Sequence, residues 1–266
     1  MLGGSRPRHL TVPANAAYPF LDWPGPLAFA HRGDASEAPE NTMPAFAHAV
    51  DLGYRYLETD AHMTADGVLV AFHDDRLDRV TDRRGRIADL LWSEVQEAKV
   101  DGREPIPLLE DLLGAWPDVR VNIDPKQDAV AESLAAAILR TGSTDRVCVG
   151  AFSDKRIAQV KALTGPTLCT SMGPREVARL VSVSRGGPGL GGVLSPCAQV
   201  PTTRGRIPLV TERFVDTAHR HGVQVHVWTI DDRSEMQRLL DLGVDGVMTD
   251  RPVVLKELLV ERGAWH

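Results

Sequence analysis

The 266-residue chain has no long apolar run, although 43% of its residues are hydrophobic. No segment approaches the ~20 consecutive apolar residues that a membrane-spanning helix needs. The first 26 residues also hold no uninterrupted apolar stretch that would serve as the core of a signal peptide. We therefore expect no integral membrane segment, no export and a cytoplasmic location.

The chain also lacks an excess of positive charge. Its 30 Lys and Arg residues are outnumbered by 36 Asp and Glu residues, which gives a net charge of −6. Proteins that bind nucleic acid usually present clustered basic side chains to the phosphates, and here the basic residues are scattered. The composition predicts that nucleic acid is not a partner.

Cysteine is scarce and odd in number. The three residues are Cys148, Cys169 and Cys197, and the first two lie inside apolar, strand-like segments. Their spacing matches no metal-ligand motif, and an odd count does not suit a disulfide framework. We expect buried free thiols in a reducing compartment rather than a metal site.

The chain does contain short β-branched or aromatic runs that alternate with amphipathic helix-like runs, as in a parallel sheet. The strand-like runs are 27–31, 55–60, 68–73, 119–124, 146–152, 166–171, 191–195, 223–228 and 245–250. Eight parallel strands with outer helices would make an α/β protein with a (β/α)₈ TIM barrel. We predict one barrel domain over 27–266, preceded by an irregular arm over 1–26.

The run at 68–73 is predicted to lie outside the barrel. Only seven residues separate it from the run at 55–60, whereas a parallel crossover needs at least ~10–12. The separating segment ends in Asp66-Gly67, a pair typical of hairpin turns. We expect an antiparallel hairpin that places His73 over the barrel mouth, followed by a charged insertion over 74–107.

Active sites of such barrels form at the C-terminal ends of the strands. Ionisable and aromatic side chains follow these ends: His31, Arg32, Glu58, Asp60, Asp124, Lys126, Trp228 and Asp250. Glu58 and Asp60 are two apart on one strand and face the same way, so at ~5 Å and a dielectric of ~20 they would repel by about 3 kcal/mol. With Asp124 they offer three oxygen ligands suited to Mg²⁺, Ca²⁺ or Mn²⁺. The alternative is an ion-pair network with Arg32 and Lys126 and no metal.

The remaining candidates fit chemistry on a phosphate. His31 and His73 suit acid and base roles because an unperturbed imidazole has a pKa of about 6.5. Arg32 and Lys126 are placed to bind phosphate oxygens, and Trp228 either walls the pocket or packs in the core. In the segment before the first helix, Asn41 or Thr42 is expected to be the N-cap, capping is the role expected for Asn41, and Glu40 is a candidate to face the site.

Four segments together resemble the glycerophosphodiester phosphodiesterase family, from about Leu27 to Pro252. They are AHRGDASEAPENTMPAFAHAVDLG, YLETDAHMTADGVLVAFHDDRLDRVTD, VNIDPK and GVQVHVWTIDDRSEMQRLLDLGVDGVMTDRP. The resemblance implies a barrel that hydrolyses a small-molecule phosphodiester to glycerol 3-phosphate and an alcohol with a divalent metal. Its residue roles would be His31 and His73 as the acid/base pair, Glu58, Asp60 and Asp124 as metal ligands, and Arg32 and Lys126 as phosphate contacts.

The chain departs from the family's commoner N-I-E-x-K pattern, because VNIDPK carries the shorter Asp124. Sphingomyelinase D enzymes of the same superfamily use a similar Asp-x-Lys pair, so a lysophospholipase D or sphingomyelinase D type of activity is one alternative. Such lipid substrates need an apolar rim, which the charged insertion at 74–107 does not offer. A catalytically silent barrel that binds phosphodiesters is the other alternative.

Overall fold

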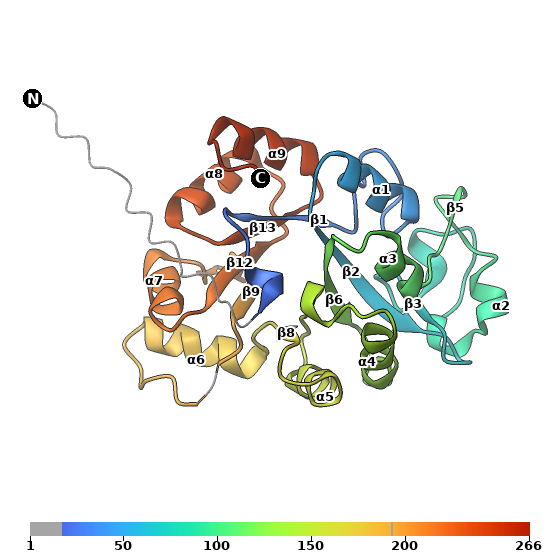
Figure 1. Ribbon diagram of the computed structural model, residues 1–266, viewed down its shortest axis with the longest axis horizontal. Coiled ribbons are helices and arrows are strands. Elements are labelled where there is room, and N and C mark those ends of the chain that lie inside the picture. Colours follow the sequence, from blue (N-terminus) through green and yellow to red (C-terminus); the bar gives the residue numbers. More distant parts are fainter. Residues whose placement is uncertain (1–17, 193) are drawn as a thin grey trace, which may run out of the picture.

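Eight parallel strands form a barrel in the computed structural model, which describes residues 18–192 and 194–266. They are β1 (Leu27–His31), β2 (Tyr56–Met63), β6 (Arg120–Pro125), β7 (Val147–Val149), β8 (Cys169–Thr170), β9 (Cys197–Pro201), β12 (Gln224–Trp228) and β13 (Gly246–Thr249). They follow the order β8-β7-β6-β2-β1-β13-β12-β9. A parallel bridge between Ser171 and Cys197 joins the two ends. The predicted TIM barrel is confirmed, and Figure 1 shows its helices on the outside.

Side-chain caps satisfy free backbone N–H groups at the start of four of the eight outer helices, those that follow Thr42, Ser153, Thr211 and Asp232. They are α1 (Met43–Asp51), α3 (Leu109–Ala115), α4 (Val130–Arg140), α5 (Asp154–Thr164), α6 (Pro174–Ser184), α7 (Glu212–Arg220), α8 (Arg233–Leu242) and α9 (Pro252–Glu261). Of the two expected N-caps, Thr42 is confirmed, because its side chain accepts a hydrogen bond from the N–H of Ala45, and the capping role expected for Asn41 is wrong. Asn41 instead adopts a left-handed φ of 55° and accepts a hydrogen bond from Thr59.

The predicted hairpin is confirmed. Strand β3 (Leu69–Ala71) runs antiparallel to the end of β2, with Ala61 opposite Ala71 and Met63 opposite Leu69. Its turn is closed by a hydrogen bond from the Gly67 N–H to the Thr64 carbonyl, and Gly67 has a φ of 88°. A residue without a side chain adopts that conformation at little cost, which explains the glycine here.

The insertion has a small core of its own. It contains the 3₁₀ turns η2 (Leu77–Arg79) and η3 (Ile87–Asp89), helix α2 (Trp92–Val95), and the hairpin of β4 (Lys99–Val100) with β5 (Glu104–Pro105). Its apolar side chains pack together with two from the β3 hairpin: Val70, Phe72, Leu77, Ile87, Val95, Ala98, Val100 and Ile106. This small core thus holds in place the segment that directly follows His73.

One strand was misplaced by sequence reasoning. The run at 191–195 was expected to be a strand, but the strand is β9 at Cys197–Pro201, and position 193 lies outside the described residues. In β9 the buried Ala198 and Val200 join the main hydrophobic core, while Cys197 and Gln199 belong to the barrel interior and cavity. The polar and proline residues of this strand interrupt the alternation of apolar and polar residues by which a strand is recognised in a sequence.

The barrel interior is charged at one end and apolar at the other. On β1, Leu27 and Phe29 precede His31 on the inward face, and on β2, Tyr56 precedes Glu58 and Asp60. Period-two alternation thus sorts aromatic side chains below the acids. The turn η1 (Pro19–Leu21) packs its buried Phe20 against Phe29 and Tyr56 at the apolar end.

Positions 1–17 of the expected N-terminal arm lie outside the described residues. Within the described ranges, no helix combines the length and apolar character that crossing a membrane would demand.

Candidate active site

All eight residues predicted to form the site line one cavity of about 810 Å³. The cavity opens at the C-terminal ends of the strands, as the barrel fold requires. Strand ends and the hairpin bring the side chains there from positions up to 197 residues apart (228 − 31). The residues are His31, Arg32, Glu58, Asp60, His73, Asp124, Lys126 and Trp228.

His31, the last residue of β1, is held between two carboxylates. Its Nδ1 lies 2.6 Å from Oδ1 of Asp250, which follows the adjacent strand β13, and its Nε2 lies 3.6 Å from Oε2 of Glu58. Burial disfavours the imidazolium, but the Glu58 charge and the Asp250 hydrogen bond outweigh it, so the pKa of His31 is raised. Asp250 thereby orients the ring with Nε2 directed toward Glu58.

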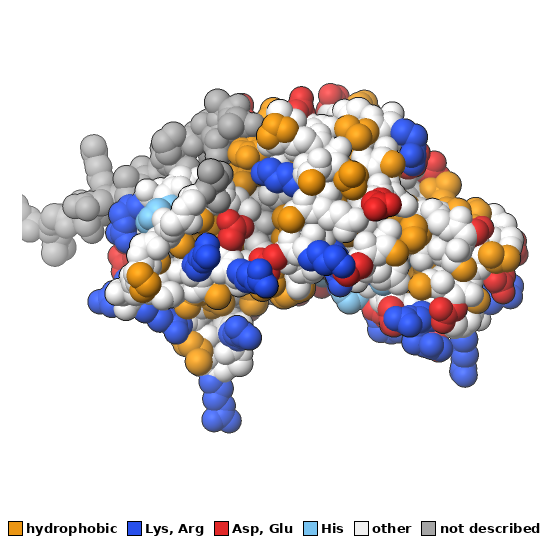
Figure 2. Space-filling view, turned by 90° about the horizontal axis from the view of Figure 1, so that it is seen from below, with side chains coloured by type: hydrophobic (Ala, Val, Ile, Leu, Met, Phe, Trp, Pro, Cys, Tyr) orange, Lys and Arg blue, Asp and Glu red, His pale blue; other side chains and the backbone are white. Residues whose placement is uncertain are grey.

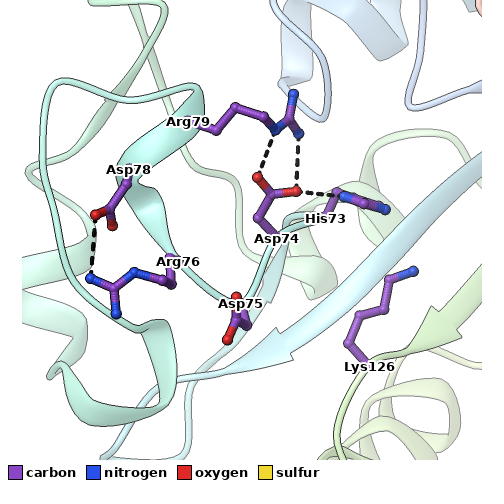
Figure 3. Close-up of a pocket in the computed structure, with 7 residues that line it drawn as sticks. All are labelled: His73, Asp74, Asp75, Arg76, Asp78, Arg79 and Lys126. Atoms are coloured by element: carbon purple, nitrogen blue, oxygen red, sulfur yellow. Dashed lines mark hydrogen bonds and ion pairs between the residues drawn. The ribbon is translucent and has the colours of Figure 1, made fainter.

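His73 is oriented in a matching way by the insertion. Its Nδ1 lies 2.6 Å from Oδ1 of Asp74, and Arg79 Nε donates to the other oxygen of Asp74 at 2.6 Å (Figure 3). The hydrogen bond from Arg79 outweighs burial and holds the pKa of Asp74 at about 2. His62 lies 3.0 Å from the His73 carbonyl through Nε2, which anchors the backbone. Figure 3 shows Lys126 across the cavity from this group.

Lys126 links two of the three acids. Asp60 and Asp124 are register partners on β2 and β6. The Lys126 ammonium donates to Oδ1 of Asp60 at 2.7 Å and to Oδ2 of Asp124 at 2.8 Å. The expected alternative of an ion-pair network therefore exists in this structure, with Lys126 at its centre.

Each acid nevertheless keeps one buried oxygen without a hydrogen-bond partner: Oε2 of Glu58, Oδ2 of Asp60 and Oδ1 of Asp124. Leaving a buried carboxylate oxygen unpaired is costly, and a hard cation satisfies such oxygens well. The donor set fits a divalent metal in chemistry. The three acids are not, however, among the described groups whose ligand atoms all lie within 4.8 Å. Direct ligation by all three requires them to move closer together.

Glu58 is the least compensated acid. Burial and the nearby Asp60 charge raise its pKa to about 8, against the opposing effect of His31. Arg32 is paired with Asp60 rather than with Glu58, and its Nε lies 3.6 Å from Oδ2 of Asp60. Glu58 therefore keeps its proton more readily than an ordinary carboxyl group and gains most from an added positive charge.

Arg32 connects the barrel to the insertion. It has a φ of 57°, and its Nη1 donates to Oε1 of Glu40 at 3.0 Å. Nη2 of Arg79 donates to the same oxygen at 2.7 Å. Glu40 is not among the residues that line the cavity, and its carboxylate holds the two guanidinium groups together beside it.

An apolar wall faces the charged groups across the cavity. Val177 and Val181 of α6 contribute to it with Leu209 and the exposed Ile207 of strand β11 (Ile207–Pro208), and strand β10 (Thr203–Arg204) precedes them. Trp228 also lines the cavity, its ring packed edge-on against Phe152 at 5.7 Å. Figure 2 likewise shows hydrophobic side chains reaching the surface beside basic ones.

The expectation that the mouth lacks an apolar rim was therefore wrong. The insertion does not supply the rim; α6 and the segment after β9 supply it.

Sequence reasoning missed the groups that position the histidines. Asp250 was noted only as a residue at a strand end, and its role could have been found from barrel closure, which makes β13 a neighbour of β1. Asp74 and Arg79 lie in the charged segment after His73, where no pattern distinguishes them from surface charges. Gln199, which donates to Asn122 at 2.8 Å inside the cavity, lies on the strand that was misplaced.

Comparisons with known proteins agree on a single family. A family model described as "Glycerophosphoryl diester phosphodiesterase family" matches residues 31–254. The "Probable glycerophosphodiester phosphodiesterase 2" of Mycobacterium tuberculosis is 39% identical, over 92% of this chain and 95% of that protein. "Lysophospholipase D GDPD1" of Homo sapiens is 26% identical, over 86% and 84% of the two chains.

A solved structure supports the fold. The Oleispira antarctica phosphodiesterase in complex with the product sn-glycerol-3-phosphate superposes with a TM-score of 0.73 at 22% identity, covering 89% of this chain and 97% of that one.

Proposed function

Because the chain belongs to the glycerophosphoryl diester phosphodiesterase family, and is thus a phosphoric diester hydrolase, we propose that it hydrolyses glycerophosphodiesters to glycerol 3-phosphate and an alcohol. The observation that carries the proposal is the convergence of two histidines, each oriented by a carboxylate, on one cavity with Arg32 and Lys126. Acid–base pairs and fixed cations are what cleavage of a phosphodiester needs.

Glu58, Asp60 and Asp124 are proposed to hold a divalent metal. The unpartnered oxygen that each acid carries supports this assignment, and an all-oxygen donor set favours Mg²⁺, Ca²⁺ or Mn²⁺. When bound, such an ion supplies Lewis-acid stabilisation of charge on the phosphate. Lys126 then shares Asp60 and Asp124 with it.

The chain's own residues divide the work of the reaction. Arg32 and Lys126 bind the phosphate oxygens and offset the charge that develops on them. One of His31 and His73 takes the proton from the nucleophile, and the other gives a proton to the departing alkoxide. The nucleophile is water or the glycerol hydroxyl of the substrate, and a cyclic phosphate among the products identifies the second route.

The test is direct product analysis. The purified protein is incubated with glycerophosphocholine, glycerophosphoethanolamine and glycerophosphoinositol, with and without a chelator. We expect glycerol 3-phosphate and the free alcohol from at least one substrate, and none with the chelator. Tight binding of these diesters without turnover would instead identify a silent binding barrel.

A second candidate activity, release of the head group from lysophospholipids, is favoured by the apolar wall. Val177, Val181 and Leu209 offer an acyl chain a surface beside the phosphate site. A relative named lysophospholipase D supports it. Adding lysophosphatidylcholine to the substrate panel discriminates the two candidate activities. A higher kcat/KM for lysophosphatidylcholine than for glycerophosphocholine would indicate that the apolar wall binds the acyl chain.

A further inference from the structure

The three cysteines, 49 residues apart in sequence at most (197 − 148), meet inside the barrel. Cys148 lies on β7, Cys169 on β8 and Cys197 on β9, and their sulfur atoms all lie within 4.8 Å of one another. All three are free and buried, at 0%, 1% and 0% exposure. None of them lines the cavity described above, so they form a separate cluster among the apolar residues below it.

Their spacing approaches that of metal ligands. Zinc–sulfur bonds of about 2.3 Å in tetrahedral geometry place sulfur atoms roughly 3.8 Å apart. The Cys197 thiol also makes a long contact, 3.9 Å, with the Thr170 carbonyl. Small apolar side chains would fill this interior equally well. Three sulfurs this close, in contrast, form a donor set selective for thiophilic ions.

A histidine beside the cluster supplies a second, independent observation. His226 on β12 is fully buried, and its Nδ1 has no hydrogen-bond partner. Its Nε2 lies 3.1 Å from Oε1 of Gln224, while the amide nitrogen of Gln224 donates to the Leu21 carbonyl. These two hydrogen bonds fix the proton of His226 on Nε2 and leave the lone pair of Nδ1 free. Metal-bound histidines are held in the same way, by a hydrogen bond from the ring nitrogen that does not bind the metal. His226 is close enough to Cys197 to interact with its thiol.

The cluster also lies where the pairing between neighbouring barrel strands is shortest. Strand β8 has two residues, and among the described residues a single bridge, between Ser171 just after β8 and Cys197, pairs this strand with β9. An ion held by one ligand from each of β7, β8 and β9 would tie this junction together. Lys161, which acts on Cys169 through its charge and has its ammonium 3.5 Å from Oγ1 of Thr170, partly offsets the added negative charge.

We infer that Cys148, Cys169 and Cys197 form a structural binding site for one thiophilic divalent ion, zinc by ligand class. Nδ1 of His226 is the fourth donor, and it moves closer on binding because it is not within 4.8 Å of all three sulfurs. The three thiols lose their protons to solvent as the three metal–sulfur bonds form. Because all three thiols are buried, the ion enters while the chain folds.

The experiment loads the full chain during expression with zinc and, separately, during refolding with Co²⁺. Metal content is measured after dialysis, and the thiolate-to-cobalt charge-transfer absorption is recorded, a signal that the carboxylate site cannot give. We expect about one tightly held ion per chain and a tetrahedral cobalt spectrum. Cys169→Ala should lower the bound metal by about tenfold or more and abolish the absorption.

A matched variant separates ligation from packing. Leu27→Ala removes volume from the same interior cluster but no sulfur, so it should retain the ion and the absorption. Hydrogen exchange gives a further readout, since the amides of Ser171 and Met172 bond to Val149 and Cys197 across the junction. They should exchange faster in Cys169→Ala than in the loaded protein.

Three reduced thiols with no bound ion and no cobalt–sulfur absorption would overturn the inference. A disulfide between two of the cysteines, or undiminished metal in Cys169→Ala, would overturn it as well.

Discussion

The two walls of the cavity differ in kind. The wall made by β1, β2, β6 and the insertion carries both histidines, the three acids and Lys126, and its charged groups are linked in pairs such as Arg32 with Glu40 and Lys126 with Asp60. The wall made by α6 and the segment after β9 is largely apolar, with Val177 and Leu209 facing the same space, and its charged residues are Arg185 and Arg204. Charges fixed on one side act on any phosphodiester, whereas apolar surface on the other side distinguishes the groups attached to it. We therefore propose that the chemistry takes place at the first wall and that the second wall selects the substrate.

The largest effect is expected on the charged wall. His31→Ala or His73→Ala should each lower kcat by ~10²–10⁴ for all substrates, because each removes one proton transfer. Steady-state kinetics measures this, with circular dichroism to verify folding. His221→Ala, at an exposed position, serves as the control. Near wild-type turnover in either active-site variant would remove that histidine from the chemistry.

Metal removal should also affect the charged wall alone. Chelation of the folded protein should abolish hydrolysis of every substrate, and Mg²⁺, Mn²⁺ or Ca²⁺ should restore it, because the three acids keep an oxygen free for a hard cation. Activity assays with titrated ions measure this. Undiminished turnover after exhaustive chelation would show that side chains such as Lys126 and Arg32 offset the phosphate charge without a metal ion.

The apolar wall is tested by Val177→Asp. The new carboxylate should raise KM for lysophosphatidylcholine by about tenfold, equivalent to about 1.4 kcal/mol, because it opposes burial of an acyl chain. Kinetics with glycerophosphocholine should change little. Val253→Asp makes the same exchange at an exposed position of α9 and is the matched control. Equal effects on both substrates would contradict the proposal that the apolar wall selects the substrate.

The smallest effect is expected outside both walls. His219 of α7 lies 2.8 Å from Asp245 through Nε2. Burial opposes its charged form, but the hydrogen bond and charge of Asp245 prevail, so its pKa is raised in the folded state. The pair therefore stabilises the fold below the unfolded pKa of about 6.5, and this stabilisation is lost as pH rises through the folded pKa.

His219→Gln should cost about 0.5–1 kcal/mol of unfolding free energy in acid and less in alkaline solution. Denaturant unfolding at several pH values measures the difference, and kcat should not change. A cost that grows with pH would contradict the assignment.

Much of the charged wall was predictable because its signals are local. The alternation in YLETD places Glu58 and Asp60 on one face, and the short turn at Asp66-Gly67 dictates the hairpin that carries His73. The apolar wall was not predictable. Its strand β9 contains Cys197, Gln199 and Pro201, which break a hydrophobic pattern, and α6 buries only Leu180 fully.

The sequence by itself determined which segments become strands, helices and turns in most of the barrel, since periodicity and turn residues act over a few positions. Only the tertiary structure decided which distant side chains meet. Asp250 reaches His31 because β13 pairs with β1, and three cysteines with no motif spacing converge because their strands are neighbours. Closing the barrel sets these distances, and they depend on strand order and register, which no local pattern encodes.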